Sequence, residues 1–194
     1  MKTLNMSLIE DETFEKQDYT KNRLPKGDYE YCTFLNCNFS EGFLSEIKFL
    51  ECKFIDCNLS ATNITGTSFQ DVTFQDCKLL GLRFDMVNPF GFAVGFKNCQ
   101  LNHASFYQLE LKKTRFINSK LKQVDFNTSD LRASIFDGCD LSQANFENSN
   151  LEKSDFRKAI NYTIHPEQNK IKGAKFSLEG VVGLLASYGV EVEI

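Results

Sequence analysis

A nine-residue block recurs seven times along this chain and constrains the fold more than any other feature of the sequence. The copies are 20 residues apart, except for one step of 22, and they begin at Cys32, Cys52, Val72, Val94, Thr114, Ser134 and Ser154. Within each block, Phe or Leu recurs at every fifth position. Self-similarity at a fixed period of this length indicates a solenoid, in which each unit buries its apolar face against its neighbours.

The five-residue period matches neither an α-helix, which has about 3.6 residues per turn, nor a flat strand, which repeats about every 2 residues. It fits a chain that turns a corner every five residues, with one large apolar side chain pointing inward on each side. Residues 20 apart match better than residues 10 apart, so four sides make one coil. We predict coils stacked at about 4.8 Å, with one all-Phe core column formed by Phe34, Phe54, Phe74, Phe96, Phe116, Phe136 and Phe156.

The repeats resemble those of pentapeptide-repeat proteins, whose motif A(D/N)LXX has Leu or Phe at its centre and a small residue two positions earlier. Good matches are Ala104-Ser105-Phe106, Ala144-Asn145-Phe146, Cys57-Asn58-Leu59 and Ser149-Asn150-Leu151. The resemblance covers about residues 27–158. It implies an all-β fold, a right-handed quadrilateral β-helix, to which the sequence adds a short C-terminal helix.

Two segments outside the regular pattern flank or interrupt these repeats. Residues 1–26 lack small residues at the inward positions, so we expect an N-terminal arm or cap. Residues 85–95 absorb the two extra residues, and Asn88-Pro89 with two Gly indicates a turn. Either Phe90 or Phe92 could fill the missing inward position. A bend in the rod and a partner-binding loop are both open for this irregular segment.

Residues 159–194 are expected to form a capping or dimerisation segment. Ser177 is suited to cap a short helix from Leu178 to about Tyr188, which Gly189 would close. The apolar face of this helix contains Val181, Val182, Leu184 and Leu185. An open β-helix end exposes unpaired backbone and needs a cover. The tail also resembles the ending of gyrase-protecting pentapeptide-repeat proteins, several of which dimerise end to end, so a homodimer is expected.

All seven cysteines lie two residues before a central Phe or Leu, where other repeats have Ala, Ser, Thr or Val. They are Cys32, Cys37, Cys52, Cys57, Cys77, Cys99 and Cys139. Cys at such a position behaves as a small buried hydrophobe. We therefore expect reduced, slow-reacting thiols without bound metal, and a reducing compartment such as the cytoplasm.

No apolar signal segment begins the sequence and no run is long enough to span a membrane.

No pattern in this sequence predicts an enzyme, a cofactor or a metal site. His103 is expected at an outward corner and His165 after the repeats, and neither has a partner at ligand spacing. A column of Asn and Asp recurs in successive coils, at Asn36, Asp56, Asp76, Asn98 and Asn118. Because short Asx side chains hydrogen-bond the local backbone, this column is expected to form turns.

Charge and resemblance together suggest a function. Some pentapeptide-repeat proteins of the quinolone-resistance kind resemble a DNA duplex in size and charge and bind type II topoisomerases. Here residues 27–95 contain 9 acids and 4 bases, whereas residues 96–158 contain 8 acids and 10 bases. The resemblance therefore suggests a DNA-mimicking partner of DNA gyrase or topoisomerase IV that itself binds no nucleic acid and no membrane. The acids expected to make the contact are Glu41, Glu46, Glu51 and Asp71. The alternative is a rigid interaction scaffold with a different protein partner.

Overall fold

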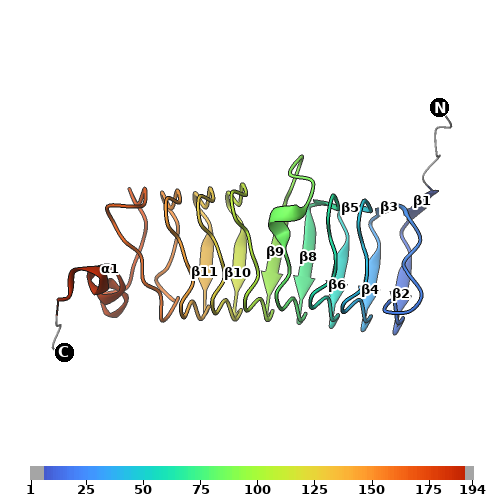
Figure 1. The fold of residues 1–194 in the computed structure, drawn as a ribbon, viewed down its shortest axis with the longest axis horizontal. Coiled ribbons are helices and arrows are strands. Elements are labelled where there is room, and N and C mark those ends of the chain that lie inside the picture. The colour runs from blue at the N-terminus through green and yellow to red at the C-terminus, as the bar shows by residue number, and fades with distance from the viewer. Residues whose placement is uncertain (1–6, 191–194) are drawn as a thin grey trace.

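The computed structural model describes residues 7–190, which form a rod of stacked coils (Figure 1). The strands are β1 (Ser7–Glu10), β2 (Thr13–Glu15), β3 (Gly27–Glu30), β4 (Thr33–Leu35), β5 (Lys48–Leu50), β6 (Lys53–Ile55), β7 (Ser68–Gln70), β8 (Val72–Gln75), β9 (Val94–Lys97), β10 (Arg115–Ile117) and β11 (Ile135–Asp137). The helical segments are the 3-10 turn η1 (Phe84–Met86), the 3-10 turn η2 (Glu179–Val181), helix α1 (Val182–Leu185) and the 3-10 turn η3 (Ala186–Tyr188).

All strand pairs are parallel and connect each coil to the next. Strands β1, β3, β5 and β7 form a sheet on the first face, and β2, β4, β6, β8, β9, β10 and β11 form a sheet on the second. The register follows the repeat: Phe34 lies opposite Phe54, and Phe74 opposite Phe96 across the 22-residue step. The chain is therefore a parallel β-solenoid, as predicted.

Ladders of single β-bridges complete the other two faces of the coil. The third face contains Asp18, Asn38, Asn58, Lys78, Gln100, Lys120, Asp140 and Ile160, and the fourth contains bridges from Phe43 to Asn63 and from Arg83 through Ser105 and Asp125 to Asn145. On the first face, bridges from Glu110 through Asp130 and Asn150 to Lys170 continue the direction of the first sheet. Four faces of five residues explain the 20-residue period.

The predicted Phe column is present and extends one ring further at each end. Its seven members are buried, and successive rings stack with centroids 4.7–5.4 Å apart. Phe14 continues the column at the N-terminal end and Phe176 at the C-terminal end. Nine stacked rings therefore form the centre of the core, which explains why no coil is stable by itself.

The small inward position of each repeat also has a hydrogen-bonding role. The Cys139 thiol donates to the carbonyl oxygen of Phe116 at 3.2 Å, and the Ser134 hydroxyl donates to that of Leu111 at 2.6 Å. In both pairs the acceptor lies 23 residues earlier, in the preceding coil. Cys, Ser and Thr are therefore favoured here because they fill a small space and also bond to the preceding coil.

The corners of the coil adopt the left-handed backbone conformation. Asn36, Asp56 and Asp76 have φ between 53° and 56°, so the Asx column does form corners, as expected. The local side-chain bonds belong to a different column: Asn58 Oδ1, for example, accepts from the Ser60 N–H at 3.1 Å. In the expected column, Asn98 donates instead to Asp76 in the preceding coil at 2.8 Å. The Asx residues on this edge thus suit the corner by their tolerance for positive φ, whereas other edges have residues such as Glu41 and Lys113 in the same conformation.

The ladder extends beyond the regular repeats at both ends. Residues 7–26, expected as an arm or cap, form the first coil, because β1 and β2 pair in register with β3 and β4. At the other end, Asp155 bridges to Lys175 before the helical segment begins. Within residues 7–190, no helix is long and apolar enough to cross a membrane.

The two extra residues of the irregular coil form a loop that projects from the rod between β8 and β9 (Figure 1). Phe90 is 80% exposed, whereas Phe92 is partly buried and packs against the core. Of the two candidates for the inward position, Phe92 is therefore the one that contacts the core.

Candidate protein-interaction surfaces

The four acids expected to contact a partner are exposed at left-handed corners, on three different edges of the rod. Glu51 and Asp71 lie on the edge between the first and second faces, in consecutive coils, and the Glu51 N–H donates to Gln70, which precedes Asp71. Glu41 follows the third face and Glu46 the fourth. The structure therefore brings two of the four acids together and separates the other two.

Two further residues belong to the edge of Glu51 and Asp71. Asp11 and Tyr31 occupy the same corner in the first two coils, and their N–H groups donate to Glu30 and Leu50. The charge of Glu51 is the main cause of a raised pKa at the Tyr31 phenol, with contributions from burial and Glu30. This edge therefore has a carboxylate in the first, third and fourth coils and a neutral tyrosine in the second. Asp11 was not predicted because it precedes the regular repeats.

Lysines partly neutralise the other acids of the N-terminal half. Lys26 forms an ion pair with Glu46, whose hydrogen bond from Lys26 lowers the pKa of the carboxyl group. Lys48 lies 3.4 Å from the Glu30 carboxylate. Among the described residues, Glu41, Glu51 and Asp71 form no ion pair. These three carboxylates are therefore free to contact a cationic partner.

Four of the eight acids in the C-terminal half, residues 96–158, form ion pairs with neighbouring bases. Arg132 contacts Asp130 at 2.6 Å, and Arg157 contacts Asp155 at 2.7 Å. Hydrogen bonding from Arg157 is the main cause of a lowered pKa at Asp155. The negative charge of this half is thereby reduced at its surface, which agrees with the count of bases in the sequence.

The C-terminal helical segment both covers the core and exposes apolar surface. The Ser177 hydroxyl accepts the Gly180 N–H at 3.0 Å, and Gly189 has φ 64°, so the helix begins and ends as expected. Leu184 packs against the core. Val181 and Val182 remain more than a third exposed, at 38% and 37%. The predicted apolar face is therefore divided between capping the rod and facing outward.

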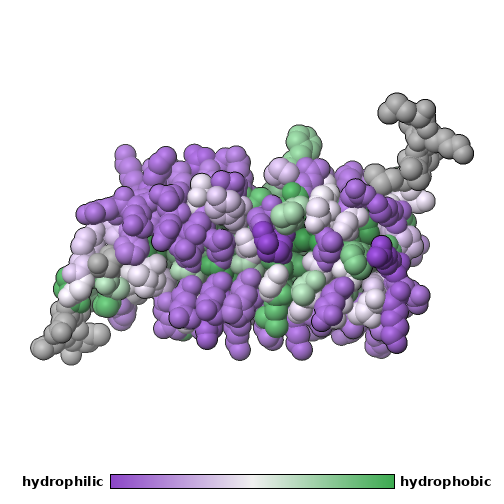
Figure 2. Space-filling view, viewed as in Figure 1, coloured by the Kyte–Doolittle hydropathy of each residue, from purple (hydrophilic) through white to green (hydrophobic). Residues whose placement is uncertain are grey.

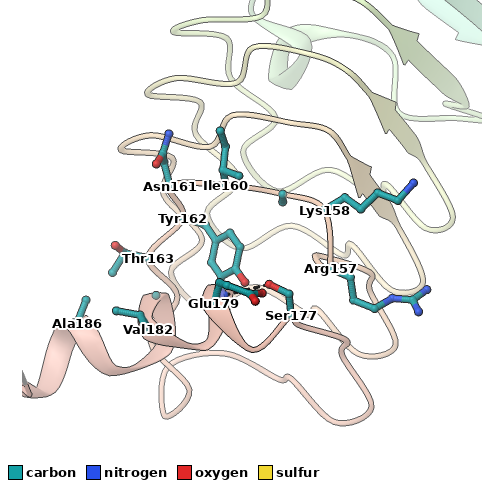
Figure 3. Close-up of a pocket in the computed structure, with 13 residues that line it drawn as sticks. Arg157, Lys158, Ile160, Asn161, Tyr162, Thr163, Ser177, Glu179, Val182 and Ala186 are labelled. Carbon is teal, nitrogen blue, oxygen red and sulfur yellow. Dashed lines mark hydrogen bonds between the residues drawn. The ribbon is translucent and has the colours of Figure 1, made fainter. Parts of the chain in front are cut away.

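A cavity of about 580 Å³ lies beside the contact between this helical segment and the last coil (Figure 3). The Tyr162 ring points toward Ser177 and Glu179, while Arg157 and Lys158 point away from it. The Tyr162 hydroxyl is buried, and it has no hydrogen-bond partner within the described part of the chain. Burial raises the pKa of Tyr162. Tyr162 thus serves as the packing surface for the helix.

The projecting loop is hydrogen-bonded to the first sheet. The Asn88 side chain accepts the Phe90 N–H at 3.1 Å and donates to the Ser68 hydroxyl at 3.2 Å. Gly91 has φ 68°, a conformation that returns the chain toward the rod. Figure 2 shows hydrophobic colour on this loop above a largely hydrophilic side of the rod. An ordered apolar projection of this kind is suited to contact another protein.

All seven cysteines are buried and free, as the small inward position predicts. Burial raises the pKa of both Cys52 and Cys139 to about 12, so these thiols are neutral at physiological pH.

His103 lies at an exposed left-handed corner, as expected. Among residues 7–190, no group of three or more His, Cys, Asp or Glu is arranged to hold a metal ion. The absence of metal from the protein stays a prediction.

These features define the molecule as a parallel β-solenoid with an acidic edge, a projecting loop and a capped end. The family model for the pentapeptide repeat region matches residues 28–88 and 92–163, and the chain belongs to the pentapeptide-repeat family. The three unmatched residues between these ranges lie in the projecting loop.

Two solved forms of one protein confirm the fold. One trypsin-treated form of QnrB1, a plasmid-mediated fluoroquinolone resistance protein, is 18% identical with a TM-score of 0.62, covering 96% of this chain and 100% of that chain. A second trypsin-treated form is 17% identical with a TM-score of 0.63, covering 94% and 99%. HetL, a protein involved in heterocyst differentiation regulation from the cyanobacterium Nostoc, is 13% identical with a TM-score of 0.49, covering 91% and 90%. No curated protein sequence matches this chain significantly.

Proposed function

We propose that this chain is a non-enzymatic binding protein whose acidic N-terminal half contacts a type II topoisomerase, DNA gyrase or topoisomerase IV. The contact would use the enzyme surface that otherwise receives DNA, with the rod acting as a partial DNA mimic. The fold similarity to QnrB1, a fluoroquinolone resistance protein, supports a protein-interaction role and motivates this choice of partner. We expect the interaction to take place in the cytoplasm.

The acidic edge is the observation that carries the proposal. Asp11, Glu51 and Asp71 lie along one edge in the first, third and fourth coils, so only Glu51 and Asp71 are separated by a single coil spacing of about 4.8 Å. Each DNA strand presents one phosphate per about 3.4 Å of helix axis. A cationic groove that binds phosphates would therefore meet a line of three carboxylates, spaced more widely than the phosphates of one DNA strand. Glu46 lies on an adjacent edge and would contact one wall of such a groove, whereas Glu41 lies on the diagonally opposite edge and faces away from it.

The basic half of the rod favours a second candidate function. Lys113, Lys153 and Lys172 form no ion pair within the described residues, and a uniform DNA mimic has no use for such lysines. A rigid scaffold that joins an acidic and a basic protein partner would use both halves. In this alternative the apolar loop would contribute to one of the two contacts.

Binding to purified enzymes separates the two candidates. The full chain is immobilised and exposed to DNA gyrase or topoisomerase IV at low salt, with and without competing duplex DNA. The proposal predicts retention of the enzyme, loss of retention as DNA is added, and inhibition of supercoiling. If neither enzyme binds at low salt, the topoisomerase proposal fails and the scaffold function is the better account.

A further inference from the structure

The first face of the rod is divided into an acidic and a basic half. In its first four layers, residues 7–11, 27–31, 48–51 and 68–71 contain six acids and one base. In its last four layers, residues 110–113, 130–133, 150–153 and 170–173 contain three acids and six bases. We call this surface the polarised face. The sign changes at the projecting loop, which occupies the fifth of nine layers.

Charged side chains of opposite sign that form no ion pair lie on either side of the loop, along the edge between the first and second faces. Asp71 lies at the corner in the layer before the loop, and Lys113 lies at the corner in the layer after it, both with positive φ. Glu51 and Lys153 lie at the corresponding corners further out on each side. None of these four residues forms an ion pair among the described residues. The edge therefore presents unsatisfied negative charge in one direction and unsatisfied positive charge in the other.

An apolar projection and a groove with both apolar and charged lining lie together at this midpoint. Phe90 is 80% exposed at the end of a loop that Asn88 and Gly91 hold in place. A groove of about 480 Å³ runs beside the loop, and Phe92 and Val94 contribute apolar lining. Asp71 and Lys113 lie at its margins. The midpoint therefore has an exposed aromatic ring beside a partly charged hollow.

We propose that the polarised face binds a second copy of this chain, side by side and antiparallel. A two-fold axis through the loop layer brings the acidic half of each copy opposite the basic half of the other, so that Asp71 of one copy faces Lys113 of its partner. The same rotation brings the two loop layers together, so that Phe90 of each copy contacts the loop layer of the other. The contact is isologous, as in most homodimers. It uses the middle of the rod and is separate from the C-terminal helix.

The most specific test of this arrangement uses two variants with opposite charge reversals, because it asks whether mixing them restores the dimer that each variant alone has lost. One variant has Glu51→Lys and Asp71→Lys, and the other has Lys113→Glu and Lys153→Glu. Acids and lysines already occupy equivalent corners in this chain, so both variants keep a compatible backbone. All chains also have Leu178→Asp and Val182→Asp to remove any contact through the exposed C-terminal residues. Circular dichroism verifies that each variant is folded.

Sedimentation velocity measures the assembly state at about 50 mM and about 500 mM salt, between which charge screening increases strongly. We expect the parent chain to dimerise at low salt and dissociate at high salt, and each charge variant to be monomeric alone. An equimolar mixture of the two variants restores the dimer, because each basic half then faces an acidic half. Phe90→Ser weakens the dimer without unfolding the chain. A monomeric parent at low salt, or a mixture that stays monomeric, overturns the proposal.

Discussion

The rings of Phe116 and Phe136 stack with centroids 5.0 Å apart and planes only 1° from parallel. Both residues are fully buried, and β10 pairs in register with β11 at this point. Phe116 also contacts Phe106 and Phe126 edge to face. A ring in this position stabilises two coil interfaces at once, so the core is sensitive to changes in single residues.

Phe116→Ala is expected to destabilise the protein by roughly 3–5 kcal/mol, as for other buried aromatic truncations. The ring has neighbours in the coils on both sides, so collapse of the surrounding chain cannot fill the space. Lys122→Ala is the control, because Lys122 is exposed and should change stability very little. Urea unfolding followed by circular dichroism measures both. Equal midpoints for the two variants would mean that the column does not support the rod.

The buried thiols predict a specific dependence of stability on alkaline pH. Burial raises the pKa of Cys52 and Cys139 to about 12, compared with about 8.5 in an unfolded chain. Because the folded state favours the neutral thiol, this contribution is complete below about pH 8.5 and is lost as pH rises toward about 12. The double variant Cys52→Ser, Cys139→Ser should show a shallower loss of stability between pH 8 and 10.5. Identical pH profiles would contradict this account of the thiols.

Close packing of the C-terminal helix on Tyr162 predicts that Gly183→Ala loosens the cap. An added Cβ would lie 2.3 Å from the Tyr162 carbonyl oxygen and 2.9 Å from a ring carbon, so the helix must shift. Gly95→Ala is the matched control, since its Cβ would meet only Thr73 at 4.0 Å. Limited proteolysis should cut the tail of the first variant faster, by several-fold. A tail equally resistant in both variants would show that the cap does not depend on this contact.

The outward residues of the same helix are predicted to join two chains end to end. Val181→Asp with Val182→Asp should convert a dimer into a monomer, because both side chains are more than a third exposed and their loss leaves the core intact. Tyr107→Asp changes a comparably exposed residue elsewhere and serves as control. Light scattering at about 500 mM salt separates this apolar contact from charge-driven association. A full-length monomer at high micromolar concentration would mean that the segment only caps the rod.

Sequence periodicity was sufficient to predict the parallel coils and the Phe column, because one residue in five must point inward wherever coils stack. The first coil was harder to predict. Glu12 and Gln17 occupy its small positions, where the regular repeats have Cys, Ser or Thr. Both side chains are exposed in the structure, since no described coil precedes them. A terminal coil therefore needs no small residue there, and the repeat signal weakens at the end of the solenoid.

The loop illustrates a second limit of sequence reasoning. The 22-residue step shows that two residues are added, but it does not indicate whether Phe90 or Phe92 faces the core. The Asx turn at Asn88 and the positive φ of Gly91 direct Phe90 outward, and Phe92 is therefore the residue that faces the core. Likewise, counting acids and bases in each half of the sequence predicted an acidic N-terminal half. That Asp11, Glu51 and Asp71 lie on one edge became evident only from the structure, in which the corners of successive coils lie above one another.

The most direct test of the topoisomerase proposal is gyrase binding by a charge-reversed chain. Glu41, Glu46, Glu51 and Asp71 are changed together to Lys, a residue that already occupies equivalent corners at Lys16 and Lys113. The control reverses four acids of the other half, Glu110, Asp137, Glu147 and Glu152. Asp140 is left unchanged because it accepts hydrogen bonds from the Ser142 N–H and hydroxyl.

The net charge changes by the same amount in both reversed chains. A difference between their affinities for gyrase therefore depends on where the reversed residues lie. Affinity for purified gyrase is measured against salt concentration, with the fold verified by circular dichroism. The account predicts that the parent chain binds gyrase at low salt and that its affinity falls as the salt concentration rises. Reversal of the four N-terminal acids abolishes binding, whereas the control reversal retains most of the affinity. Absence of binding by the parent at low salt, or equal loss in both reversed chains, would contradict it.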